Sequence, residues 1–204
     1  RQVRASRPSV EFQDIYRSHV LNFAPSSRYA PINEVGNMLI ISHDAFMPNM
    51  APFVTHKNSI GISTTMVGIS SVGNDHASIK SYIQGIYNDA DPPLEFVALA
   101  GDATGSYAIA TWFETLSGWS GEGDHPYTML EGNDILADIH IGRLSISSTS
   151  ELELIVNKII GYESQPYIQD PDWFTRACLV GDPSSSGSSC IGVQQWTKTR
   201  LLDI

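Results

Sequence analysis

The sequence predicts an α/β fold built on a mainly parallel sheet flanked by helices. Short apolar runs that suit strands buried on both faces recur along the chain, beginning with "NMLIIS" at residues 37–42. Segments with a helical spacing of apolar residues lie between these runs, as in Ile79, Tyr82, Ile83 and Ile86. Strands that alternate with helices are typical of parallel sheets.

The expected elements can be placed one by one. Asp75 is positioned to cap a helix, and the spacing of Ser148 and Glu151 is that of a capping box. Pro48 and Pro52 make the start of the first helix irregular. In chain order the expected elements are a strand at 37–42, a helix at 44–58, a strand at 61–69, a helix at 76–88, a strand at 94–102, a long loop at 103–123, two short strands at 125–130 and 137–144 that can pair, a helix at 149–164, a strand at 175–182 and a helix from 190.

The composition limits the classes of partner. The chain has 204 residues, enough for one sizeable core or a domain with an extension. Its 22 acidic and 12 basic residues give a net charge of -10, which argues against nucleic acid or an anionic membrane as the main partner. No apolar run approaches the roughly 20 residues that span a bilayer. The chain has no initiator Met or signal peptide, and we expect it to be an internal piece of a longer protein.

The cysteines and histidines give no catalytic pair on their own. Cys178 lies in the apolar run "ACLVG" and is expected to be a buried, inert thiol, whereas Cys190 follows a Ser/Gly-rich loop. Neither cysteine has the spacing of a zinc site. His140 alternates with apolar neighbours and should face away from them, and His125, beside Asp124 in a loop, is the histidine best placed for a functional role.

The loop at 179–192 also raises the possibility of phosphate binding. It is rich in Gly and Ser and lies between an expected strand and an expected helix. It matches neither the dinucleotide-binding nor the P-loop pattern, and the negative charge of the chain disfavours nucleotides.

Acidic residues at strand ends predict a cation site. Asp102 ends one expected strand, and Asp134 and Asp138 lie in and after a Gly-Asn-Asp turn. Three carboxylates that converge repel one another unless a cation neutralises them. Carboxylates together with turn carbonyls suit Ca²⁺ better than Mg²⁺. The alternative is that Asp134 caps a turn and Asp138 is a solvated strand residue.

Several stretches together resemble the gingipain-like cysteine endopeptidases, which have a caspase-like α/β fold. They are "MLIISHDAF", "PFVTHKNSIGISTTMV", "ASIKSYIQGIY", "FVALAGD", "GNDILADIHIGRLS" and "NKIIGYES". In order and spacing they are similar to the first half of the family's catalytic domain, over about 37–182. A Gly-Asp strand end followed by the G-N-D…I-G-R pattern is specific as a combination.

The resemblance implies a structural Ca²⁺. Its side-chain ligands would be Asp102, Asp134 and Asp138, and backbone carbonyls near Glu131 and Leu136 would complete the shell. The ion would tie the loop to the edge of the sheet.

The resemblance also implies a thiolate nucleophile and a histidine base, both of which would lie beyond this chain. Asp182, one position from the family's pattern, would be the orienting acid of the catalytic site. Cys190 falls where arginine-cleaving members carry an acid, which puts arginine specificity in doubt.

The N-terminal region resembles the junction of an inhibitory pro-segment with the mature enzyme. Arg28 and Tyr29 would flank the processing site. Residues 1–28 would then be the tail of the pro-segment, and residues 29–204 the N-terminal part of the catalytic domain.

The sequence therefore predicts part of a secreted, extracellular or cell-surface cysteine endopeptidase that acts on polypeptide substrates and binds its own pro-segment. The fragment alone is expected to be inactive. The first alternative is a non-catalytic member that serves as a binding or surface-assembly module. The second is a flavodoxin-like domain that binds a ligand through residues 181–190.

Overall fold

The computed structural model contains two compact units, residues 1–161 and 162–204. The residues described are 17–18, 36–116, 119–165, 169, 171–181 and 188–202. The predicted processing site at Arg28 and Tyr29 and the predicted orienting acid Asp182 lie outside these residues.

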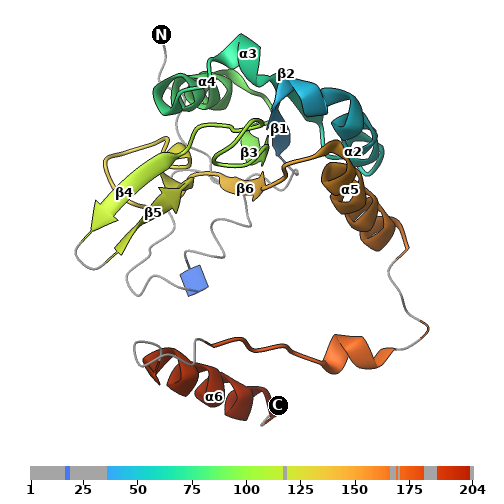
Figure 1. The fold of residues 1–204 in the computed structure, drawn as a ribbon, viewed down its shortest axis with the longest axis vertical. Coiled ribbons are helices and arrows are strands. Elements are labelled where there is room, and N and C mark those ends of the chain that lie inside the picture. The colour runs from blue at the N-terminus through green and yellow to red at the C-terminus, as the bar shows by residue number, and fades with distance from the viewer. Residues whose placement is uncertain are drawn as a thin grey trace. The chain divides into compact units, whose positions relative to one another are not determined.

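A four-stranded parallel sheet forms the centre of the first unit (Figure 1). The strands are β1 (Asn37–Ser42), β2 (Thr64–Gly68), β3 (Leu94–Ala100) and β6 (His140–Leu144), in the order β2-β1-β3-β6. Every neighbouring pair is parallel, with Phe96 opposite His140 and Ala100 opposite Leu144 in the pair β3–β6. This arrangement confirms the predicted α/β class with a parallel sheet.

Helices cover both faces of the sheet. One face packs against η1 (Asp44–Phe46), α2 (Met47–Ser59) and α5 (Thr149–Ser164), and the other against α3 (Ile69–Val72) and α4 (His76–Asp89). Alternation along the strands divides the core, so that Leu39 and Ile41 belong to one cluster and Ile40 to the other. The two clusters are the two sides of a three-layer α/β unit.

The predicted caps set the starts of two helices. The Asp75 side chain accepts a hydrogen bond from the Ser78 N–H (2.9 Å) at the start of α4. The Ser148 hydroxyl accepts one from the Glu151 N–H (3.2 Å) at the start of α5. Glu151 in turn accepts from the Ser147 N–H (2.7 Å). These contacts satisfy backbone donors that have no partner inside the helix.

Two expectations for the middle of the chain were wrong. The expected loop at 103–123 contains an antiparallel hairpin, β4 (Trp112–Leu116) and β5 (Trp119–Gly123). The expected strand at 125–130 contains the 3₁₀ helix η2 (His125–Tyr127), so residues 137–144 do not pair with it. β6 instead joins β3 as the fourth strand of the main sheet. Pro126 at the start of η2 fits a helical turn better than a central strand.

The second unit contains η3 (Pro171–Thr175) and α6 (Ser188–Leu202). The strand predicted at 175–182 is not present, because residues 176–181 form no regular structure. Cys178, expected to be buried, is exposed, as is Cys190. An apolar run becomes a buried strand only with a ladder partner and covering layers, and residues 176–181 have no ladder partner among the described residues.

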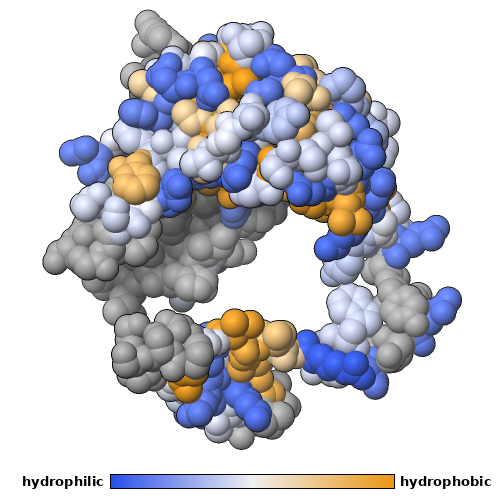
Figure 2. Space-filling view, viewed as in Figure 1, coloured by the Kyte–Doolittle hydropathy of each residue, from blue (hydrophilic) through white to orange (hydrophobic). Residues whose placement is uncertain are grey.

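Large apolar side chains are exposed on both units. The visible face of the first unit is mainly polar, with small separate apolar patches (Figure 2). On α6, Val193 and Trp196 are 59% and 62% exposed, and in the first unit Phe113 and Ile135 are 67% and 79% exposed. Among the described residues, no helix combines the length and apolar character that crossing a bilayer requires.

Candidate functional site

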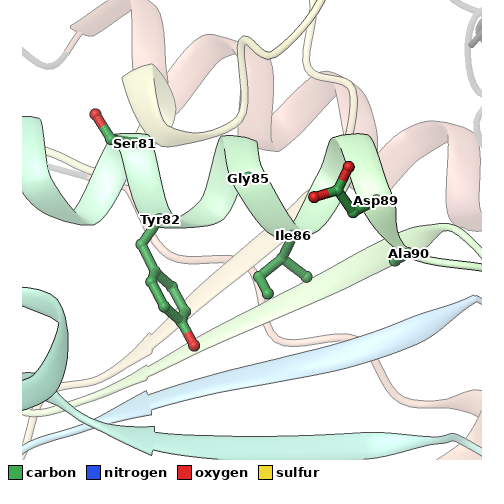
Figure 3. A pocket seen from close by; sticks show the side chains of 6 residues that line it. All are labelled: Ser81, Tyr82, Gly85, Ile86, Asp89 and Ala90. Carbon is green, nitrogen blue, oxygen red and sulfur yellow. The ribbon is translucent and has the colours of Figure 1, made fainter. Parts of the chain in front are cut away.

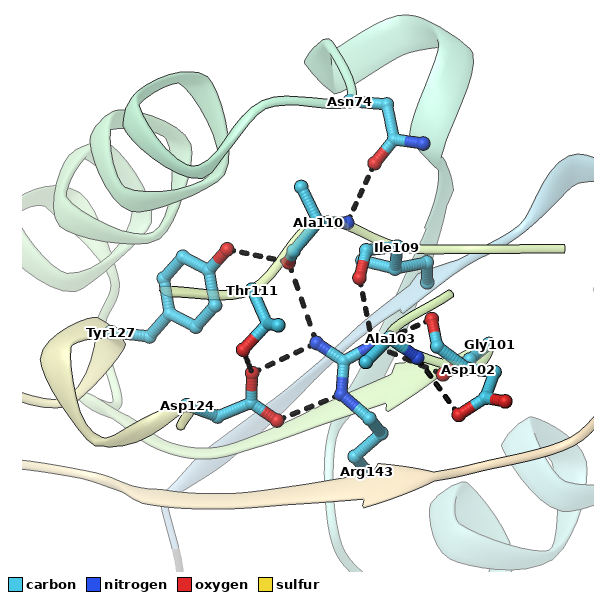
Figure 4. A network of polar contacts seen from close by, with 10 residues as sticks. All are labelled: Asn74, Gly101, Asp102, Ala103, Ile109, Ala110, Thr111, Asp124, Tyr127 and Arg143. Atoms are coloured by element: carbon cyan, nitrogen blue, oxygen red, sulfur yellow. Dashed lines mark hydrogen bonds and ion pairs between the residues drawn. The ribbon is translucent and has the colours of Figure 1, made fainter. Parts of the chain in front are cut away.

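Arg143 of β6 is the centre of a polar network at the carboxyl end of the sheet (Figure 4). Its side chain is only 9% exposed. Nη1 donates to the carbonyls of Gly101 (3.1 Å), Asp102 (3.1 Å) and Ile109 (2.9 Å). Nη2 donates to the Ala110 carbonyl at 3.4 Å. One guanidinium thus holds both ends of the segment that connects β3 to the hairpin.

Asp124 neutralises this arginine. Its carboxylate accepts from Arg143 Nε and Nη2, each at 2.8 Å, in a two-pronged pair. The Thr111 hydroxyl donates to the same carboxylate at 2.8 Å. Thr111 precedes β4 and Asp124 follows β5, so the pair also closes the base of the hairpin.

Tyr127 of η2 also belongs to the network. Its ring is fully buried, and its hydroxyl donates to the Ala110 carbonyl at 2.7 Å. Burial raises the pKa of Tyr127, and the nearby charge of Asp124 raises it further. The hydroxyl therefore remains a donor across the physiological range.

Asp102 lies in this network mainly through its backbone. Its carbonyl accepts from Arg143 and from the Ile109 N–H (2.8 Å), and its side chain accepts from the Ala103 N–H (2.9 Å). The preceding glycine is required by close approach, because a Cβ on Gly101 would meet the Tyr107 carbonyl at 2.6 Å. The predicted Gly-Asp strand end is thus a tightly packed turn.

The acidic loop at 131–138 lies before β6. Asp138 Oδ2 accepts from the backbone N–H groups of Leu130 (2.6 Å) and Glu131 (2.7 Å). Asp134 accepts from the Leu136 N–H at 2.9 Å, which is an Asx turn. Glu131 accepts from the Tyr87 hydroxyl at 3.0 Å. Asp138 is therefore a half-buried loop anchor, not the solvated strand residue of the alternative interpretation.

The acidic side chains of this loop affect one residue's pKa in particular, that of Asp138. Burial raises the pKa of Asp138, and the charges of Glu131 and Asp134 raise it further, while the two backbone N–H groups oppose the rise. Lys80 of α4 lies beside them and donates to the carbonyls of Pro126 (2.7 Å) and Met129 (2.5 Å). Burial lowers the pKa of Lys80, and the charge of Asp138 opposes that shift.

The structure does not bring Asp102 to the acidic loop. β6 begins at His140, which is level with Phe96, and Asp102 lies six residues beyond Phe96 at the other end of β3. Six extended residues span roughly 20 Å, so Asp102 and Asp138 lie near opposite ends of the strand pair. Within the described residues, no three His, Cys, Asp or Glu side chains form a group that could hold a metal ion.

The acidic loop by itself contains a smaller set of candidate oxygen ligands for a calcium ion. Each of Glu131, Asp134 and Asp138 has one carboxylate oxygen engaged in the hydrogen bonds above, which leaves the other as a candidate donor. The chemistry of these donors fits Ca²⁺, but the loop as it stands does not converge them.

The remaining candidates have ordinary contacts. His125 Nε2 lies 2.9 Å from the Ile135 carbonyl, where it ties η2 to the acidic loop. The His140 ring stacks on Phe96 with 5.5 Å between centroids. A surface hollow of about 450 Å³ lies along α4 and contains none of the predicted site residues (Figure 3). It is lined by Ser81, Tyr82, Gly85, Ile86, Asp89 and Ala90.

The sequence alone indicated no role for Arg143 or Tyr127. Asp124 was notable there only as the neighbour of His125. One signal was available, since an arginine inside a strand pattern must find several acceptors if the strand is buried. The identity of those acceptors depends on the path of residues 101–111, which carries no local pattern.

A parallel sheet between two helical layers is the architecture of an open α/β domain, in which ligands bind at the carboxyl ends of the strands, where the polar network lies here. Solved structures share this fold. The chain aligns over 86% of its length with 41% of the crystal structure of the Arg-specific cysteine proteinase gingipain R, with a TM-score of 0.66 and 24% identity. A solved structure described only as a protease aligns over 84% of the chain, with a TM-score of 0.64 and 25% identity.

The chain belongs to peptidase family C25, whose profile matches residues 32–201. Gingipain R2 of Porphyromonas gingivalis (strain ATCC BAA-308 / W83) is 27% identical over 187 residues, which are 87% of this chain and 24% of that protein. Lys-gingipain of Porphyromonas gingivalis (strain ATCC 33277) is 28% identical over 167 residues, which are 77% of this chain and 9% of that protein. The chain thus spans about a quarter or less of these relatives. The predicted family and fold are confirmed.

Proposed function

We propose that this chain is the N-terminal part of the catalytic domain of a secreted cysteine endopeptidase. The family match over residues 32–201 carries the proposal, since it covers the whole parallel sheet. In the full protein a thiolate would attack the peptide carbonyl, a histidine would transfer the proton, and backbone N–H groups would stabilise the oxyanion.

The nucleophile and its base are proposed to lie outside these 204 residues. All six histidines precede residue 141, whereas the two cysteines are at 178 and 190. Neither compact unit therefore contains both a cysteine and a histidine. The role of this chain would be to supply the sheet and one wall of the substrate cleft.

The test is a peptidase assay of the longer protein and of the isolated 204-residue chain. Fluorogenic peptides with Arg, Lys, Leu or Asp before the scissile bond would report activity and specificity together. Hydrolysis by the longer protein that a thiol alkylating agent abolishes, with none by the isolated chain, is the expected result. No hydrolysis of any peptide or of denatured casein by the longer protein would favour a non-catalytic binding module.

Asp182 is proposed as the acid that orients the catalytic histidine. It follows Gly181 in the segment that leads to α6. An Asp182→Asn substitution in the longer protein should lower kcat and leave the KM for a short peptide within about twofold. Unchanged kcat would remove Asp182 from the catalytic site.

Cleavage between Arg28 and Tyr29 is proposed to release a pro-segment that partners the mature enzyme. A complex of the pro- and mature domains of the relative RgpB has been solved, and it aligns with 62% of this chain at a TM-score of 0.55. N-terminal sequencing of the secreted protein should find Tyr29 as the first residue. A mature protein that retains residues 1–28 would contradict the proposal.

A structural Ca²⁺ is proposed for the acidic loop, with the carboxylates of Asp134 and Asp138 and the backbone carbonyls near Glu131 and Leu136 as ligands. The charges of Glu131 and Asp134 raise the pKa of Asp138, which supports the proposal because a cation would relieve this repulsion. Asp102 is left out of the set because it lies at the other end of the strand pair. Added Ca²⁺ should raise the melting temperature in EDTA-treated protein, and Asp134→Ala should abolish the rise. No rise in the unsubstituted chain would refute the site.

A further inference from the structure

The segment 101–111 lies at the edge of the sheet where ligands are expected to bind. It follows β3, an inner strand of the sheet, at the carboxyl edge. In open parallel sheets, ligands bind outside the carboxyl ends of the strands. If the chain forms part of a peptidase domain as proposed above, the path of this segment shapes the wall nearest to the bound peptide.

Side chains, not a regular ladder, hold this segment in place. Within it, the backbone ladder is reduced to a single bridge between Asp102 and Ala108. Asn74 donates to the Ala108 carbonyl (2.9 Å) and accepts from the Ala110 N–H (2.8 Å). Arg143, Asp124 and Tyr127 supply the other side-chain hydrogen bonds to its ends (Figure 4), while the Gly101 N–H donates to the Leu144 carbonyl (3.1 Å) and Ile109 is buried in the core.

The planar guanidinium of Arg143 matches the arrangement of hydrogen-bond acceptors around it. Its donors reach four carbonyls of the segment and two oxygens of Asp124 at once. A lysine ammonium could not reproduce this planar pattern of donors. With exposed fractions of only 9% and 18%, the pair excludes most water, so its geometry is fixed by the protein.

We infer that Arg143 and Asp124 are positioning residues for the peptidase reaction, which hold the segment 101–111 and the base of the β4–β5 hairpin in the shape that the substrate requires. Their effect is exerted through the backbone of Gly101, Asp102, Ile109 and Ala110. This inference rests on the proposed function.

The test uses the longer protein, with active sites counted by a thiol-directed irreversible peptide inhibitor. The variants are Arg143→Lys and Asp124→Asn, with Thr111→Val as a milder change that leaves the ion pair in place. Arg176→Lys is the matched control, because Arg176 pairs with Asp172 where both side chains are more than two-thirds exposed. All rates are measured well below each variant's melting temperature and expressed per titrated site.

A displacement of about 1 Å in the groups that position a substrate can lower the reaction rate about 100-fold. We therefore expect kcat per titrated site to fall about 10- to 100-fold in Arg143→Lys and Asp124→Asn. It should fall by less in Thr111→Val and stay unchanged in Arg176→Lys. In an additional variant, Arg143→Ala, ethylguanidinium should restore part of the rate, and ethylammonium should not. A role in stability alone would lower the number of titrated sites but leave kcat per site intact.

Two failures can be told apart. Activity of the unsubstituted protein with normal kcat per site in every variant would overturn the inference and leave the proposed function standing. No activity and no titratable site in the unsubstituted protein would overturn the proposed function, and the inference would fall with it.

Discussion

Asp138 is predicted to stabilise the acidic loop through its shape as an acceptor more than through its charge. Its Oδ2 atom accepts two backbone N–H groups at 2.6 and 2.7 Å. An Asp138→Ala substitution leaves both donors without this partner. At about 1 to 1.5 kcal/mol for each bond, we expect a loss of about 2 to 3 kcal/mol in the free energy of unfolding. For a chain of this size, that corresponds to a fall of about 4 to 12 °C in melting temperature.

The isosteric variant separates shape from charge. Asp138→Asn keeps an oxygen that can accept both N–H groups and removes the repulsion from Glu131 and Asp134. We expect it to lose less than about 1 kcal/mol, since the acceptor geometry is preserved. Asp134→Ala is the control, because Asp134 is exposed and holds only a local turn.

The assay is urea unfolding at pH 7 in EDTA, followed by far-ultraviolet circular dichroism. EDTA removes any contribution of a bound ion, so the comparison reports the hydrogen bonds alone. If Asp138→Asn were as unstable as Asp138→Ala, the charge would be the stabilising feature and the reasoning would be refuted. An Ala variant as stable as the unsubstituted chain would refute the contribution of the two bonds.

Three further predictions concern the sheet and its helices. Phe46 is fully buried, so Phe46→Ala should cost about 3 to 5 kcal/mol in urea unfolding, and a loss below about 1 kcal/mol would contradict this packing. Hydrogen bonds from Ser70 lower the pKa of Asp44 below 3.8, so its contribution is present above about pH 4 and is lost as the pH falls through the lowered value. Unfolding curves of Asp44→Asn and the unsubstituted chain should therefore converge in acid, and a constant difference from pH 7 to pH 2 would refute the shift. A Cβ on Gly68 would collide with the Asp44 carboxylate, whereas one on Gly85 in α4 meets open space. Gly68→Ala should destabilise the chain by about 1 to 3 kcal/mol and Gly85→Ala should stabilise it by about 0.5 to 1 kcal/mol, and differential scanning fluorimetry that showed the same sign for both would contradict the account.

Local patterns were sufficient for most elements of the first unit. The apolar run at 37–42 became β1, and the helix predicted at 149–164 has those bounds in α5. The caps at Asp75 and Ser148 were predicted because they depend on residues three positions apart. Such signals survive in the structure because they are satisfied within one turn of the chain.

The second unit and the hairpin show where local patterns failed. Residues 176–181 have a strand-like composition but form no strand, because a strand needs a partner that the pattern itself does not supply. The hairpin at 112–123 carries no Asn-Gly or Asp-Gly turn between its strands, so the strongest local hairpin signal was missing.

The candidate site was only partly predictable, for a geometric reason. The sequence determined that acids gather at 131–138 and that Asp102 ends a strand. It did not determine their distance, since the parallel register of β3 and β6 sets which residues share an end of the sheet. That register separates Asp102 from Asp138, and it brings Arg143 to the carbonyls of Gly101 and Ala110. The sequence alone specified the family, the four strands of the main sheet and the acids, whereas the tertiary structure alone decided which charges meet, because contacts between distant residues follow from strand register and loop path.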